Sequence, residues 1–118
     1  MVATKTLLIV ENDAITREAL ADRLHQAGYK VLWAVNGAEA LAFLRNVRPD
    51  LILLDTLMPD LDERHFVQQV KATKLPTIPI IDITTTIDTC QWIVDRGSIH
   101  KPFDLDAVLQ AVQRCLET

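Results

Sequence analysis

The sequence predicts an α/β fold in which helices cover both faces of a sheet of five parallel strands. Short apolar runs recur along the chain, longer segments with helical spacing lie between them, and the runs contain little polar alternation. Strands that are buried on both faces have this continuous apolar character. A regular succession of strands and helices in 118 residues predicts one doubly wound domain with right-handed crossovers.

Five apolar runs rich in Val, Ile and Leu are the candidate strands. They are Leu7–Val10, Val31–Val35, Leu51–Leu54, Ile78–Ile83 and, with fewer apolar residues, Gly97–His100. Each is far shorter than the ~20 apolar residues that a membrane-spanning helix needs. The residues before the first run also lack the form of a signal peptide. We therefore expect no association with a membrane.

Four segments carry apolar residues at steps of three and four, the spacing of an amphipathic helix. Asp13 and Asn36 are expected to cap the first two helices, Asp62 and Asp104 could cap the others, and Gly28 should end the first. The apolar sets are Ile15, Ala19, Leu20, Leu24 and Ala27; Ala38, Leu41, Ala42 and Leu44; Phe66, Val67 and Val70; and Leu105, Val108, Leu109, Val112 and Leu116.

The segment from Thr84 to Arg96 has a less regular pattern. It begins with three consecutive threonines, which are poor helix formers beyond the cap position. Few residues then remain before Gly97. We expect a shortened helix or an irregular loop here.

The composition is that of an ordinary acidic globular protein. Apolar residues make up 49% of the chain, charged residues 24%, and the net charge is −4. Because Lys and Arg form no cluster, binding of nucleic acid through a basic face is not expected. Cys90 and Cys115 have no metal-binding spacing. They are interpreted as reduced thiols, which favours a cytoplasmic location.

Polar residues stand where the predicted strands end. In a doubly wound sheet, ligands bind at the carboxyl ends of the strands. We therefore expect acidic, hydroxyl and ammonium groups to gather at one rim, with Asp13 capping a helix rather than binding a ligand. The rim residues are Glu11, Asn12 and Asp13 after the first run, Asp55 after the third, Thr84 after the fourth and Lys101 after the fifth.

Four motifs in this order resemble the receiver domain of two-component response regulators, which accept phosphate from histidine kinases. They are "LIVEND", "PDLILLDTLMPDLD", "IPIIDITT" and "HKPF", and the resemblance covers the whole chain. It implies a flavodoxin-like sheet with strand order 2-1-3-4-5, and it identifies Asp55 as the residue that takes the phosphoryl group.

The resemblance also implies a Mg²⁺ site. Its ligands would be Glu11, Asn12, Asp55 and the backbone carbonyl of Leu57. A carboxylate nucleophile must approach an anionic phosphoryl donor, so the like charges have to be offset. A bound Mg²⁺ achieves this by bridging carboxylate and phosphoryl oxygens in octahedral geometry.

Thr84 and Lys101 complete the site that the resemblance implies. The Thr84 hydroxyl would donate a hydrogen bond to a phosphoryl oxygen, and Lys101 would supply a compact positive charge. Residues 1–118 would form a single receiver domain without an output domain. Its partners would be a histidine kinase or phosphotransfer protein and an unknown downstream protein.

Two substitutions depart from the family pattern. Asn12 replaces the second acid of the metal-binding pair, so we expect weaker Mg²⁺ binding with phosphorylation retained or slowed. Ser98 replaces the aromatic residue that usually stands three positions before the lysine. The usual coupling between movement of the threonine and burial of that aromatic ring is then unavailable.

The stretch from Thr84 to Lys101 is also short. It lacks about five residues compared with typical family members, which is more than one helical turn. This resembles a subgroup of receivers that have a curtailed fourth helix and often stand alone. The usual glycine of that subgroup after the threonine is absent, because Thr85 stands there.

Asp82 interrupts the otherwise apolar run "IPIIDIT". By strand alternation it shares a face with Ile80 and Thr84. A carboxylate buried there without compensation would be costly. We expect the short segment that follows to leave this face partly open, so that Asp82 is either solvated or paired.

Three other functions are alternatives to a phosphoacceptor. A receiver fold could bind proteins independently of phosphorylation, an alternative that Asn12 and Ser98 favour. A phosphatase with an aspartyl nucleophile would carry an acid two positions after Asp55, where Leu57 stands. A flavoprotein would need a phosphate-binding loop after the first strand, which is absent. We therefore expect a signalling protein that assists its own phosphorylation and dephosphorylation, and not an enzyme.

Overall fold

The computed structural model describes residues 4–55, 63–73, 78–84, 97–100 and 105–117. They form a five-stranded parallel sheet with the order β2-β1-β3-β4-β5. The strands are β1 (Thr6–Val10), β2 (Lys30–Ala34), β3 (Leu51–Asp55), β4 (Ile80–Thr84) and β5 (Gly97–His100). The predicted fold class and strand order are therefore confirmed.

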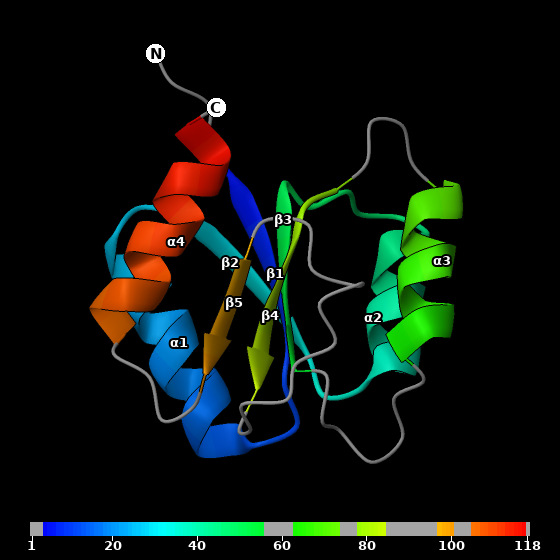
Figure 1. Ribbon diagram of the computed structural model, residues 1–118, viewed down its shortest axis with the longest axis horizontal. Coiled ribbons are helices and arrows are strands. Elements are labelled where there is room, and N and C mark those ends of the chain that lie inside the picture. The colour runs from blue at the N-terminus through cyan, green and yellow to red at the C-terminus, as the bar shows by residue number, and fades with distance from the viewer. Residues whose placement is uncertain (1–3, 56–62, 74–77, 85–96, 101–104, 118) are drawn as a thin grey trace.

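Four helices are present in the described part of the chain. They are α1 (Ala14–Gln26), α2 (Gly37–Leu44), α3 (Glu63–Thr73) and α4 (Leu105–Glu117). Figure 1 shows α1 and α4 on one face of the sheet and α2 and α3 on the other. None of these helices is long and apolar enough to cross a membrane. The predicted short helix or loop in 85–96 and the predicted caps Asp62 and Asp104 lie outside the described residues.

Side chains alternate between two cores because successive residues of a strand point to opposite faces. Each apolar side chain that is fully buried stabilises the fold by about 1.5–3 kcal/mol relative to its exposure. The core under α2 and α3 contains Leu8, Val10, Ile52, Leu54, Ile80, Phe66, Val67 and Val70. The core under α1 and α4 contains Leu7, Ile9, Leu51, Leu53, Ile81, Ile83, Leu20, Leu24, Val108, Leu109 and Val112.

The ends of α1 and α2 follow the predicted capping pattern. The Asp13 carboxylate accepts a hydrogen bond from Thr16 N at 2.9 Å. The Asn36 side chain accepts one from Glu39 N at 2.7 Å. Gly28 follows the last turn of α1 with a φ of 102°, a left-handed conformation that glycine adopts without strain.

Local predictions differ from the structure at several positions. The helical spacing places Ile15 on the apolar stripe of α1, but its side chain is 80% exposed. It lies in the first turn, which projects past the strand ends in Figure 1, and the buried side of the helix begins at Leu20. β4 begins at Ile80 rather than Ile78. Pro79 lacks the backbone N–H that a ladder residue donates.

Candidate functional site

Glu11 directly follows β1, and Asp55 ends the neighbouring strand β3 at the equivalent level. Val10 of β1 is the Cα partner of Leu54 in β3, so the next residue of each chain segment stands at the same level. The Glu11 N–H extends the ladder by donating to the Ala34 carbonyl at 3.0 Å. Adjacent strands lie about 4.8 Å apart. The fold therefore brings these two acidic residues together at the carboxyl edge of the sheet.

Both residues are shielded from water. Glu11 is 0% exposed and Asp55 is 5% exposed, and each takes part in polar or electrostatic interactions within the chain. Burial of a charged carboxylate is expensive unless neighbouring groups compensate it. Two such carboxylates side by side form a site whose charge favours a cation with oxygen ligands.

Asn12 and Asp13 follow Glu11 but have different surroundings. Asn12 is exposed, and its amide carries no charge to add to the carboxylates. Asp13 is engaged at the start of α1, where its carboxylate also accepts a hydrogen bond from the Thr16 hydroxyl. Of the three polar residues after β1, Asp13 is therefore the one that caps α1.

Replacing Asp13 with alanine should lower the free energy of unfolding by about 1 kcal/mol, because the first turn of α1 loses its cap. Asp13→Ser retains a capping oxygen and should recover most of this loss. Urea denaturation measures both variants. Affinity for Mg²⁺ should be the same as in the original chain for both, and a large loss of affinity in Asp13→Ser would instead make Asp13 a metal ligand.

The remaining predicted site residues are only partly covered by the structure. Thr84 is the last residue of β4, and His100 of β5 is its Cα partner. This position brings the end of β4 to the same edge as Asp55, whose own Cα partner is Ile83. Leu57 and Lys101 lie outside the described residues, so their placement at the site stays a prediction.

Asp82 is fully buried, with 0% exposure. The expectation that an open face would leave it solvated is therefore wrong. Its Cα partners are Leu54 on one side and Ser98 on the other, which places it inside the sheet rather than at its rim. Asp82 takes part in an interaction within the chain, so pairing is the alternative that stands.

Arg17 is a residue of this region that the sequence patterns did not reveal. Its guanidinium donates to the backbone carbonyl of Glu11 at 3.0 Å. The same group lies over the ring of Trp33, 4.5 Å from the centroid. Arg17 thus ties the end of β1 to β2. No residue spacing predicts it, because these contacts join three elements that meet only in the fold.

Replacing Arg17 with alanine should lower the free energy of unfolding by about 1–2 kcal/mol. The loss combines a charge-assisted hydrogen bond with a cation–π contact. Arg45→Ala is the matched control, because Arg45 is exposed at the end of α2. Its effect should stay within about 0.5 kcal/mol. Equal losses in chemical denaturation of the two variants would contradict a special role for Arg17.

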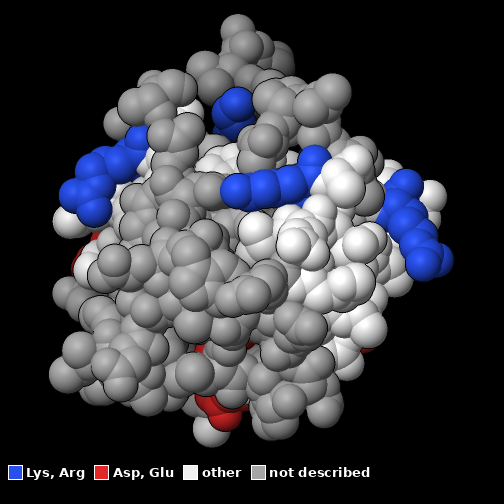
Figure 2. All heavy atoms as spheres, turned by 45° about the vertical axis from the view of Figure 1, so that its right-hand side comes forward, with Lys and Arg blue, Asp and Glu red and all other residues white. Residues whose placement is uncertain are grey.

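The charge distribution agrees with an acidic rim. Figure 2 shows acidic atoms at the lower end of the molecule, the end toward which the arrowheads of β4 and β5 point in Figure 1. The described lysine and arginine side chains on that face lie apart in its upper part. This view therefore shows no continuous basic surface among the described residues.

The model of the response regulator receiver domain family matches residues 7–113. The chain belongs to this family. As a receiver domain it is similar to Response regulator MprA of Mycobacterium sp. (strain KMS), with 33% identity over 93% of this chain and 50% of that protein. It is also 34% identical to Transcriptional regulatory protein AfsQ1 of Streptomyces coelicolor, over 92% of this chain and 51% of that protein. The chain thus spans about half the length of these relatives.

Solved structures of receiver domains have the same fold. The chemotaxis response regulator CheY4 of Vibrio cholerae aligns with a TM-score of 0.84 and 29% identity, covering 95% of this chain and 98% of that one. The receiver domain of sensor histidine kinase PA1611 from Pseudomonas aeruginosa aligns with a TM-score of 0.85 and 23% identity, over 98% and 100% of the two chains. That structure is described as having a magnesium ion coordinated in the active site cleft.

Proposed function

We propose that this receiver domain accepts a phosphoryl group on Asp55 from a histidine kinase or a phosphotransfer protein. One observation carries the proposal: the Asp55 carboxylate ends β3 at the same level as the buried Glu11 on the adjacent strand. Family membership supports the reaction class. The proposed activity is that of a signalling protein of two-component systems.

The transfer makes one bond and breaks one. A carboxylate oxygen of Asp55 attacks the phosphorus of a phosphohistidine, and the phosphorus–nitrogen bond breaks. The imidazole keeps the electron pair and takes up a proton, while Asp55 becomes an acyl phosphate. In this proposal the Thr84 hydroxyl donates a hydrogen bond to a phosphoryl oxygen, and Lys101 balances the added negative charge. Water later hydrolyses the acyl phosphate.

A Mg²⁺ ion fits the oxygen donors of this site. We assign as its ligands Glu11, Asn12, Asp55 and the backbone carbonyl of Leu57, a set composed only of the oxygen atoms that Mg²⁺ prefers. The magnesium ion described for the PA1611 receiver domain supports this assignment. When bound, the ion offsets the repulsion between the carboxylates and the incoming phosphoryl oxygens.

Incubation with acetyl phosphate and Mg²⁺, followed by intact mass measurement, tests the proposal. The chain should gain the mass of one phosphoryl group, and the gain should be absent in Asp55→Asn and in the presence of a chelator. The Asp22→Asn variant, which changes an exposed acid of α1, should gain the same mass as the original chain. Failure of the folded original chain to gain mass with acetyl phosphate and Mg²⁺ would refute the proposal.

A second function has one observation in its favour. Asn12 leaves the acidic pair with one carboxylate, which would suit a receiver fold that binds a protein without phosphorylation. In that case acetyl phosphate would add no mass and Mg²⁺ would bind weakly or not at all. We prefer the phosphoacceptor function to phosphorylation-independent binding, because the carboxylates of Glu11 and Asp55 are both present at adjacent strand ends.

The output we propose is binding of a downstream protein in the cytoplasm. Phosphorylation adds a charge of roughly −1.5 to −2 at the rim, which alters the surface that a partner contacts. Control of transcription is named for AfsQ1, a protein of about twice the aligned length. For this chain we propose phosphate-dependent protein binding only.

A further inference from the structure

β2 lies at one edge of the sheet and carries apolar side chains on both faces. Trp33, on the side of α1, is 48% exposed. Leu32, on the side of α2, is only partly buried against the core there. An edge strand flanked by apolar side chains is a ready template for pairing with another strand.

The outer edge of β2 is open over a short stretch. Lys30 N donates to Lys5 O at 2.9 Å, and Ala34 O accepts from Glu11 N at 3.0 Å. Alternate residues of a parallel strand direct both backbone groups to the same neighbour, so Lys30, Leu32 and Ala34 face β1. Val31 and Trp33 therefore direct their N–H and C=O groups outward, where no strand of the described residues pairs with β2.

The amides that flank this stretch are already bonded within the chain. Tyr29 N donates to Leu24 O at 3.3 Å. Val35 N donates to the Glu39 carboxylate at 3.2 Å. The open part of the edge is thus limited to Val31 and Trp33, which is a short and well-defined register for any added strand.

We propose that β2 pairs antiparallel with β2 of a second copy of this chain, about a twofold axis at Leu32. Val31 of each copy then stands opposite Trp33 of the other. All outward N–H and C=O groups of these two residues form hydrogen bonds across the axis. The interface is isologous, because the same patch serves both copies, and the two sheets become continuous.

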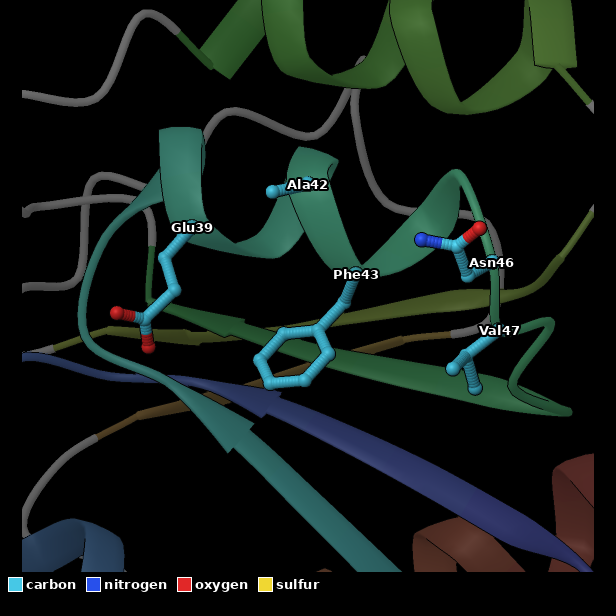
Figure 3. A pocket seen from close by; sticks show the side chains of 5 residues that line it. All are labelled: Glu39, Ala42, Phe43, Asn46 and Val47. Carbon is cyan, nitrogen blue, oxygen red and sulfur yellow. The ribbon is translucent and has the colours of Figure 1, made fainter.

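The side chains fit this register on both faces. On the α1 side, the exposed ring of Trp33 packs against Val31 of the second copy. On the α2 side, Leu32 of one copy stands opposite Leu32 of the other. They form a non-hydrogen-bonded pair of the antiparallel ladder, in which the side chains are closest. An open groove of about 230 Å³, lined by Glu39, Ala42, Phe43, Asn46 and Val47, runs along α2. Figure 3 shows the Phe43 ring directed from α2 toward the strands.

Charge complementarity favours the second copy over an arbitrary peptide. Lys30 stands at the start of β2, and Glu39 binds the backbone just after its end, through Val35 N. Both side chains are exposed. Antiparallel pairing brings Lys30 of each copy toward Glu39 of the other, so two attractive contacts form at opposite ends of the interface.

Sedimentation equilibrium over a range of protein concentrations tests the proposal, which does not depend on phosphorylation. The original chain should form a reversible dimer, and Trp33→Lys should weaken it about tenfold or more, because an exposed edge lysine opposes strand pairing. Ile15→Lys is the matched control, since Ile15 is 80% exposed but lies on α1. A monomer up to roughly millimolar concentration, or equal weakening by both variants, would overturn the proposal.

A charge exchange distinguishes this register from other dimers. Lys30→Glu alone places like charges at both ends of the interface, and so does Glu39→Lys alone. Each variant should dimerise about tenfold more weakly than the original chain. Mixing the two should restore a mixed dimer, because both contacts become attractive again. No recovery in the mixture of folded variants, as judged by circular dichroism, would refute the register.

Amide hydrogen exchange gives a residue-specific check. The amides of Val31 and Trp33 should become protected as the protein concentration rises. The Leu32 amide, which faces β1, should be protected equally at every concentration. A dimer in which Val31 and Trp33 exchange as fast as in the monomer has its interface elsewhere and contradicts the proposal.

Discussion

Replacing Asn12 with aspartate should raise the affinity of the receiver domain for Mg²⁺ by about tenfold or more. Even at the dielectric constant of water, a unit charge 4 Å from a divalent ion contributes about 2 kcal/mol. A change of about 1.4 kcal/mol is already a tenfold change in the dissociation constant. Asn12 is exposed, so the added charge costs little desolvation.

Isothermal titration calorimetry of the two proteins measures this difference. Asn46→Asp is a matched control, because Asn46 is also exposed but lies beyond the end of α2. It adds the same net charge away from the strand ends and should leave the affinity nearly unchanged. Equal affinities of the original chain and Asn12→Asp would refute the idea that the amide weakens the site.

In metal-free buffer, Asp55→Asn should raise the free energy of unfolding by about 1–2 kcal/mol. Glu11 and Asp55 are buried at the same level of adjacent strands. Two unit charges about 5 Å apart repel by about 3 kcal/mol at an effective dielectric constant of 20. Lost hydrogen bonds of the carboxylate offset about 1 kcal/mol of the gain.

Urea denaturation with a chelator and with saturating Mg²⁺ measures both halves of this prediction. The original chain should be stabilised by Mg²⁺, by about 2.7 kcal/mol at a concentration of 100 Kd, and Asp55→Asn should lose most of that response. Asp22→Asn is the control, because Asp22 is exposed on α1. If Asp55→Asn has a lower free energy of unfolding than the original chain in the presence of the chelator, repulsion from Glu11 is not the dominant interaction of the Asp55 carboxylate.

These two predictions depend differently on sequence and structure. Asn12 could be singled out from the chain alone, because it interrupts an acidic pair after an apolar run. The consequence for Asp55 needed the register of β1 and β3 and the burial of Glu11. Neither the distance between strands nor the loss of solvent at their ends is encoded in a local pattern.

Errors in the sequence interpretation have a common origin. Ile15 fits the helical stripe of α1, yet the stripe only becomes buried where the helix passes over the sheet. The sequence predicts that Asp82 is solvated or paired, but the side chain is fully buried and therefore not solvated. A periodic pattern identifies a face, but the length of the face that is covered depends on the neighbouring elements.

The succession of strands and helices, the caps at Asp13 and Asn36 and the acidic residues at the strand ends could all be predicted from the chain alone. Each depends on residues close together in sequence, whose apolar periodicity or capping chemistry is local. The shielding of Glu11, the contacts of Arg17 and the open edge of β2 required the folded chain. They arise from elements that are distant in sequence but pack side by side. Only that packing determines which polar groups are buried and which strand edge stays open to solvent.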